Sequence, residues 1–179
     1  MSTHVALLRA INVGGRNSLP MKTLVALFEA LGCGNVRTYI QSGNVVFEAS
    51  DALARRVPKA IHAAIEKQCG FSVPVVTRSH AELAKVARGH FFAKRAKDTK
   101  ALHVAFLADI PSAERIALLD PKRSPPDELK VVGRDIHLLL PNGVGSSKLT
   151  NVYLDAKLAT VSTIRNFATI QTLDEMCGG

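Results

Sequence analysis

The chain is poor in aromatic residues and in cysteine. It has no tryptophan, 2 tyrosines, 7 phenylalanines and 3 cysteines among 179 residues. Cys33, Cys69 and Cys177 are widely spaced, odd in number and form no CxxC pair, so the pattern supports neither a disulfide framework nor a cysteine zinc site. We therefore expect a protein of the reducing cytoplasm.

Long apolar runs are missing as well. The first apolar stretch, residues 5–8, ends at Arg9 and is not preceded by a cationic leader. No stretch approaches the roughly 20 apolar residues that a membrane-spanning helix needs. We expect the chain to be neither exported nor embedded in a membrane.

Metal-binding patterns are absent from the sequence. No histidine belongs to an HxH or HExxH pattern or to a cluster with carboxylates, so we expect no metal site and no cofactor. The six histidines are His4, His62, His80, His90, His103 and His137.

Acidic residues are outnumbered by basic ones. The 23 Lys and Arg stand against 15 Asp and Glu, which gives a formal net charge of +8. Residues 1–100 hold 15 basic and 6 acidic residues, whereas residues 101–179 hold 8 and 9. A basic excess favours an acidic partner, such as nucleic acid or a phosphorylated metabolite, and the first part of the chain carries it.

The order of elements predicts an α+β fold. Apolar patterning indicates strands over 5–8, 36–40, 45–48 and 73–77, and helices over 21–31 and 51–68. Ser18 is the expected cap of the first helix, and Pro58 either starts or kinks the second. This βαββαβ order is the split arrangement of a ferredoxin-like sandwich, an antiparallel sheet with helices on one face.

A second half of similar kind follows a basic stretch. Ser79 and Glu82 have the spacing of a capping box, so a short helix is expected to Arg88. Strands are expected over 102–107, 128–132 and 135–140, with helices over 147–158 and about 166–176. We therefore predict two ferredoxin-like halves plus a C-terminal helix, with the domain limits 1–90, 91–100 as a basic linker, and 101–179. One larger mixed sheet is the alternative.

Several separate motifs occur in an order that matches a known family. They are residues 6–15 (ALLRAINVGG), 35–47 (NVRTYIQSGNVVF), 141–143 (PNG), 147–151 (SKLTN) and 163–167 (TIRNF). The chain resembles, over nearly its whole length, the bacterial family called domain of unknown function 1697. The resemblance implies two ferredoxin-like subdomains and no established activity. Phe167 stands where the family has a tryptophan, which removes an indole N–H donor.

Two glycine loops are the candidate ligand sites. Each follows a strand and is expected to open a helix, where unpaired backbone N–H groups and the helix dipole favour anions. The alternative is that the glycines and asparagines only shape tight turns. The second loop lacks the GxxxxGK[ST] spacing of a phosphate-binding P-loop. The candidate ligand-binding residues in and near these loops are Arg9, Asn12, Gly14, Gly15, Arg16, Asn17, Ser42, Gly43, Asn44, Gly143, Gly145, Ser147, Lys148, Arg165 and Asn166.

Nucleic acid is the alternative ligand. The stretch 85–100 interleaves Phe91 and Phe92 with basic residues, a mixture that can pair phosphates and stack bases. The basic residues of that alternative are Lys94, Arg95, Lys97 and Lys100. Residues 5–8 have no aromatic side chain, which disfavours base stacking on the sheet of the first half.

The sequence thus favours a cytoplasmic protein that binds an anionic, phosphorylated or nucleotide-like small molecule at loops in a cleft between the two halves. A nucleic-acid-binding module and a protein-interaction domain are the alternatives. No catalytic residue is assigned, and enzyme activity and oligomeric state stay open.

Overall fold

The computed structural model describes residues 1–178 and divides into two compact units. Unit 1 comprises Met1–Ala84 together with the C-terminal residues from Thr172 onward, and unit 2 comprises Lys85–Gln171. Residues 91–100 therefore belong to unit 2. The limits 1–90, 91–100 and 101–179 stay a prediction of domain organisation.

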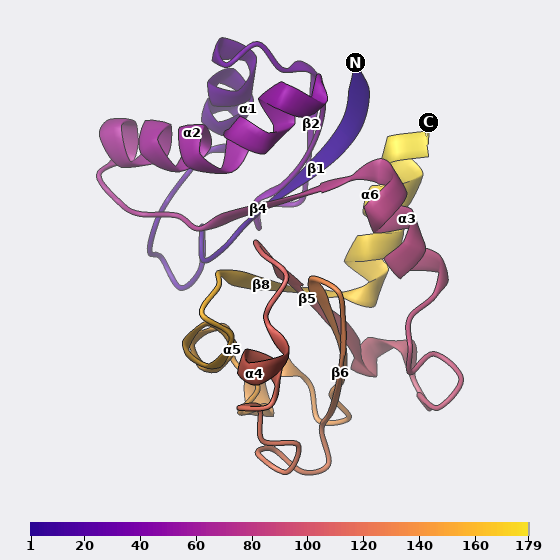
Figure 1. Ribbon diagram of the computed structural model, residues 1–179. Coiled ribbons are helices and arrows are strands. Elements are labelled where there is room, and N and C mark those ends of the chain that lie inside the picture. The colour runs from indigo at the N-terminus through magenta and orange to yellow at the C-terminus, as the bar shows by residue number, and fades with distance from the viewer. Residues whose placement is uncertain (179) are drawn as a thin grey trace. The chain divides into compact units, whose positions relative to one another are not determined.

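Unit 1 contains one four-stranded antiparallel sheet in the order β2-β3-β1-β4. Helices α1 and α2 cover one face of this sheet (Figure 1), where Phe28 of α1 and Ile61 of α2 join Phe47 of β3 in one apolar core. The elements are β1 (Ser2–Leu8), α1 (Met21–Ala30), β2 (Gly34–Tyr39), β3 (Asn44–Ala49), α2 (Asp51–Cys69), β4 (Val75–Ser79) and α3 (His80–Arg88).

Unit 2 has the same sheet order, β6-β7-β5-β8. Leu154 of α5 packs with Ala105 of β5 and Leu138 of β7 in its core. The elements are the 3₁₀ turn η1 (Thr99–Ala101), β5 (Leu102–Leu107), α4 (Ala113–Ile116), β6 (Glu128–Val132), β7 (Asp135–Leu139), the 3₁₀ turn η2 (Val144–Ser146), α5 (Asn151–Leu158), β8 (Ser162–Asn166) and α6 (Phe167–Gly178).

Both sheets confirm the predicted α+β fold of two ferredoxin-like halves with a C-terminal helix. One β-hairpin and two crossover connections through helices give each sheet the strand order expected for βαββαβ. In unit 1 the register places Arg78 of β4 opposite Val5, and in unit 2 it places Arg165 of β8 opposite Val104. A further helix follows the last strand of each sheet without a loop, α3 after Ser79 and α6 after Asn166.

Three local expectations were wrong. Helix α5 begins at Asn151 and not at Ser147, because Thr150 caps it by accepting a hydrogen bond from the Tyr153 N–H at 3.2 Å. Ser18 does not cap α1, whose N-cap is Pro20. Strand β8 was not expected at all. Helix α2 runs from Asp51 through Pro58, so the proline does not start it.

Among residues 1–178, no helix has both the length and the apolar composition needed to cross a bilayer.

Candidate functional site

The first glycine loop is a miniature hairpin and does not open a helix. Val13 and Arg16 form an isolated antiparallel bridge, with the Arg16 N–H donating to the Val13 carbonyl at 3.0 Å. Gly14 and Gly15 occupy the two central turn positions with φ of +58° and +72°, and a tight hairpin turn of this type requires positive φ at both. The turn geometry alone thus explains both glycines.

Asn12 holds this loop together. Its side-chain amide donates to the carbonyls of Leu19 and Gln41, both at 2.9 Å, and its oxygen accepts from the Leu19 N–H at 2.8 Å. The Gln41 contact brings the loop against the β2–β3 hairpin, where Ser42, Gly43 and Asn44 lie. Two sets of predicted ligand-binding residues, those of the first glycine loop and those of the β2–β3 hairpin, therefore lie next to each other in unit 1. The side-chain amide of Asn12 already makes hydrogen bonds to backbone groups.

We expect Asn12→Ala to lower the free energy of unfolding by about 2–3 kcal/mol, because it removes three hydrogen bonds that satisfy backbone groups. Urea titration followed by circular dichroism measures the change. Ser18→Ala, in the same loop, is the matched control, and an equal effect of both substitutions contradicts a specific role for Asn12.

The second glycine loop forms the turn η2 and then runs extended. Gly143 has φ of +80°, and Ser147 is extended with ψ of 141°. The Lys148 N–H donates to Ser124 Oγ at 3.0 Å, and the Lys148 carbonyl accepts from Arg123 Nε at 3.1 Å. Because these contacts hold the backbone of Lys148 outside the helix, the helix-start environment expected around Lys148 is absent.

The two loops belong to different units, the first to unit 1 and the second to unit 2. The expectation that they share one cleft stays a prediction, as does a ligand-binding role for their residues. Arg165 lies on β8, where its guanidinium donates to Thr163 Oγ1 at 2.8 Å and to the Ile164 carbonyl at 2.9 Å. Burial lowers the pKa of Arg165 to about 10.

The basic stretch 91–100 is packed onto unit 2 and is not a free connector. His90 Nε2 donates to the His103 carbonyl at 2.9 Å, and the Phe91 N–H donates to His137 Nδ1 at 3.1 Å. Phe92 is only 2% exposed, so it is not accessible for stacking on a base. Arg95 lies 2.8 Å from Glu128 and over the Phe92 ring.

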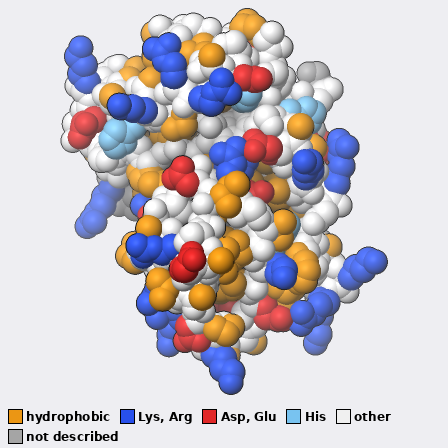
Figure 2. Space-filling view, in the orientation of Figure 1, with side chains coloured by type: hydrophobic (Ala, Val, Ile, Leu, Met, Phe, Trp, Pro, Cys, Tyr) orange, Lys and Arg blue, Asp and Glu red, His pale blue; other side chains and the backbone are white. Residues whose placement is uncertain are grey.

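These contacts leave fewer exposed cations in the stretch 91–100 that could bind the phosphates of a nucleic acid. Lys94, Lys97 and Lys100 are exposed, whereas the charge of Arg95 is paired with Glu128. On the face seen in Figure 2, Lys and Arg side chains stand singly or in small groups among other residues and form no continuous stripe. Neither observation favours a nucleic-acid groove.

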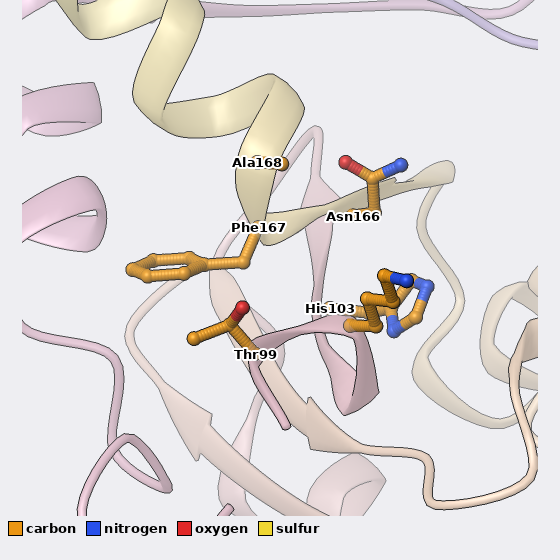
Figure 3. Close-up of a pocket in the computed structure, with 6 residues that line it drawn as sticks. Thr99, His103, Asn166, Phe167 and Ala168 are labelled. Carbon is orange, nitrogen blue, oxygen red and sulfur yellow. The ribbon is translucent and has the colours of Figure 1, made fainter.

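A pocket of about 330 Å³ opens in unit 2 beside the first turn of α6. His103 and Asn166 lie on one side of it, Thr99 and Phe167 on the other, and Ala168 at the start of α6 (Figure 3). The sixth lining residue is Lys100. His103 and Asn166 are direct partners in the pairing of β5 with β8, so their side chains share one face of the sheet.

Asn166 caps α6 at this pocket. Its side-chain oxygen accepts from the Thr169 N–H at 2.8 Å, an N–H group at the start of a helix that has no partner within the helix itself. The helix has 12 residues and no acidic side chain in its first turn. The positive end of its dipole therefore faces the pocket without a compensating carboxylate of its own.

His103 brings a buried imidazole to the same place. The residue as a whole is 7% exposed, and its Nδ1 lies 3.4 Å from the Ala101 carbonyl. Because a carbonyl only accepts hydrogen bonds, Nδ1 carries the proton and Nε2 presents a lone pair. Burial lowers the pKa of His103, which keeps the ring neutral near pH 7. Within residues 1–178, no hydrogen bond to His103 Nε2 is found.

Charge is concentrated in the unit that holds this pocket. Residues 85–171 contain 14 basic and 8 acidic residues, a formal net charge of +6, whereas unit 1 contains 9 and 7. When the chain is divided at residue 100, the excess of basic residues falls in the first part. When it is divided into the two units of the structure, the excess falls in unit 2, because residues 85–100 belong to unit 2.

Sequence reasoning identified Asn166 and Lys100 but missed His103 and the pocket itself. His103 was missed because strand β8 was not predicted, and the pairing of β8 with β5 is what brings Asn166 next to His103. A signal was present: the run Val161, Ser162, Thr163 and Ile164 is rich in β-branched residues, which favour strands.

Another cluster, in unit 1, has the composition of a catalytic triad but not its geometry. Ser2 Oγ lies 2.9 Å from His4 Nε2, and Asp51 Oδ1 lies 3.6 Å from the same nitrogen. In a nucleophilic triad the carboxylate orients the imidazole through the other ring nitrogen. Among the described residues, no three His, Cys, Asp or Glu side chains are placed to hold a metal ion.

The fold and the pocket define an α+β protein of two ferredoxin-like units, one of which has a pocket lined by one lysine, three other polar side chains, a phenylalanine and an alanine. The chain belongs to the family described as "Protein of unknown function (DUF1697)", whose profile matches residues 1–137. Among solved structures it is similar to the conserved bacterial protein SP0830 from Streptococcus pneumoniae, with 19% sequence identity, a TM-score of 0.71 and 98% of each chain covered. That likeness shows the fold alone. No curated protein matches the chain.

Proposed function

We propose that this protein binds a small anionic molecule in the pocket of unit 2, at the start of α6. The observation that carries the proposal is that Lys100, His103 and the start of α6, which has no acidic residue in its first turn, meet around one pocket. Backbone N–H groups at a helix start bind phosphate and carboxylate groups, and a lysine adds a full positive charge.

The surroundings of the pocket support this assignment. Unit 2 carries the larger share of the positive charge, which attracts anions over a distance of about a Debye length. The volume of about 330 Å³ suits a metabolite and is too small for a folded macromolecular partner. Of the residues predicted from the sequence to bind a ligand, Asn166 lines this pocket, and a phosphorylated or nucleotide-like ligand remains within the proposal.

The proposal is tested by Lys100→Ala, with Lys94→Ala as the matched control. Both lysines are exposed and belong to the same segment, but only Lys100 lines the pocket. Isothermal titration with inorganic phosphate, sugar phosphates and nucleotides gives the affinities, and a bound ligand raises Tm. We expect Lys100→Ala to weaken binding about fivefold to tenfold and Lys94→Ala to leave it within twofold.

Two outcomes contradict the proposal. In the first, no phosphorylated compound binds the wild-type protein at millimolar concentration. In the second, Lys94→Ala weakens binding as much as Lys100→Ala, which indicates general charge attraction and not a site.

A further inference from the structure

Unit 2 contains a second pocket, of about 350 Å³, at the end of the sheet where β6 begins and β7 ends. Glu128 and Leu139 are the last pair of that ladder, and Leu139, which is buried, lines the pocket. Two prolines line it just beyond this pair: Pro126 lies two residues before Glu128, and Pro141 lies two residues after Leu139. Because proline has no N–H group, neither position brings a backbone donor to the pocket.

The basic stretch 91–100 supplies the rest of the wall. It is held against the sheet by the hydrogen bond from the Phe91 N–H to His137, and His137 and Leu139 share one face of β7 because they are two positions apart. Asp98 then caps the turn η1 by accepting from the Lys100 N–H at 2.9 Å, and η1 leads directly into β5. Contacts within unit 2 therefore fix the walls of the pocket without a ligand.

Apolar side chains make up most of the lining of this second pocket. Small-molecule pockets have volumes from about 300 Å³ and are mostly apolar, with a few polar groups that orient the ligand. The second pocket fits this description in both respects. Five of its eight lining residues are apolar, namely Ala96, Ala101, Pro126, Leu139 and Pro141.

The other three lining residues are charged, and two of them already have partners. Arg95 is paired with Glu128 at 2.8 Å, and Asp98 accepts from the Lys100 N–H. Lys97 is exposed and makes no hydrogen bond or ion pair within residues 1–178. The charge that this pocket offers to a ligand is therefore positive, and an anionic group complements it.

We infer that the second pocket of unit 2 binds a small apolar molecule with one anionic end, such as a medium-chain carboxylate. The apolar chain packs against Leu139 and the two prolines, and the anionic group lies beside Lys97. The site shares no lining residue with the pocket at the start of α6, so this inference is independent of the proposed function.

The test begins with a series of ligands on the wild-type protein, by isothermal titration at pH 7.5. Butyrate, hexanoate and octanoate carry the same charge and differ only in apolar length. We expect the affinity to rise about twofold to fourfold for each methylene group that enters the pocket, the upper value corresponding to complete burial. Octanoate is expected to bind about threefold more tightly than octan-1-ol, and octylammonium more weakly than both, because of the charge of Lys97.

Matched variants locate the apolar chain. Ala96→Leu places a larger side chain at the pocket and is expected to weaken octanoate binding at least tenfold. Ala93→Leu, in the same stretch but outside the pocket, is the control and is expected to leave the affinity within twofold. Circular dichroism and Tm establish that both variants are folded.

A second pair of variants locates the anionic end. Lys97→Met keeps the apolar stem without the charge and is expected to abolish the preference for octanoate over octan-1-ol, with the affinity for octan-1-ol unchanged within twofold. Lys94→Met, at an exposed lysine outside the pocket, is expected to keep the preference. Lys100→Ala, which alters the other pocket, is expected to leave octanoate binding within twofold.

Four outcomes overturn the inference. Wild-type protein that binds no octanoate, or that binds butyrate equally well, has no apolar site of this kind. Equal effects of Ala96→Leu and Ala93→Leu mean that the chain binds elsewhere. A preference for octanoate that persists in Lys97→Met contradicts the placement of the anion. Loss of octanoate binding in Lys100→Ala means that the carboxylate occupies the other pocket, whereas the proposed function is judged separately by its own titrations with phosphorylated compounds.

Discussion

Gly43→Ala is expected to lower the free energy of unfolding by about 3 kcal/mol. A Cβ atom at this position would lie 2.7 Å from Leu8 Cβ and 3.0 Å from Ile11 Cδ1, and both neighbours are buried in the core of unit 1. The φ of +80° adds about 1–2 kcal/mol for any L-residue with a side chain, and overpacking a core adds about 1–3 kcal/mol.

Gly145→Ala is the matched control for this prediction. Gly145 lies in the other glycine loop, has no positive φ, and has nothing within 4 Å of an added Cβ. We expect its free energy of unfolding to stay within about 0.5 kcal/mol of wild type. Denaturant unfolding followed by circular dichroism measures both variants, and a Gly43→Ala protein as stable as Gly145→Ala contradicts the packing described for the β2–β3 hairpin.

Acidification from pH 6.5 to pH 4 is expected to cost about 3 kcal/mol of stability through His137 alone. Burial, with a smaller contribution from the neighbouring His90, lowers the pKa of His137 from 6.5 to about 4. Between these values the unfolded chain binds a proton that the folded chain does not, so the contribution of His137 to the free energy of unfolding rises with pH across this range and levels off above it. His90 and His103, whose pKa values are also lowered by burial, act in the same direction.

His137→Asn isolates this contribution. The asparagine oxygen replaces Nδ1 as the acceptor for the Phe91 N–H but does not titrate. Urea unfolding at a series of pH values is expected to show a pH dependence smaller than that of wild type by about 3 kcal/mol between pH 4 and 6.5. An unchanged pH dependence means that other groups cause the acid sensitivity.

Much of the fold was predictable because its signals are local. The capping box of Ser79 and Glu82 is present as expected, and Gly133 has positive φ at the turn between β6 and β7. These features depend on residues within four positions of one another, and alternation of apolar residues supplied most of the strands. Strand β8 was missed because residues 159–165, between the two expected helices, were assigned to no element, and Asn166 leads into α6 with no turn residue that would mark the end of a strand.

The candidate site was less predictable because it depends on distant pairing. Asn166 could be singled out from a motif, but its neighbour His103 follows only from the register of β5 with β8. The expectation that each glycine loop opens a helix was wrong for a physical reason: asparagine and glycine adopt positive φ, and both loops use this freedom to make turns that end before a helix begins. The basic stretch 91–100 was interpreted as a linker because neither His90 nor Phe92 shows, in sequence, what it packs against.

The backbone contacts of His90, His103 and His137 fix which ring nitrogen carries the proton in each. His90 donates through Nε2 and accepts at Nδ1 from the Phe92 N–H, and His137 accepts at Nδ1, so both are Nε2–H tautomers, whereas His103 is Nδ1–H. Long-range ¹⁵N–¹H correlation spectra distinguish these two forms by their nitrogen shifts. The three histidines of unit 2 can therefore report on ligand binding. A molecule that binds in the pocket is expected to change the nitrogen shifts of His103 most, because His103 lines the pocket. The nitrogen shifts of His90 and His137 serve as internal references.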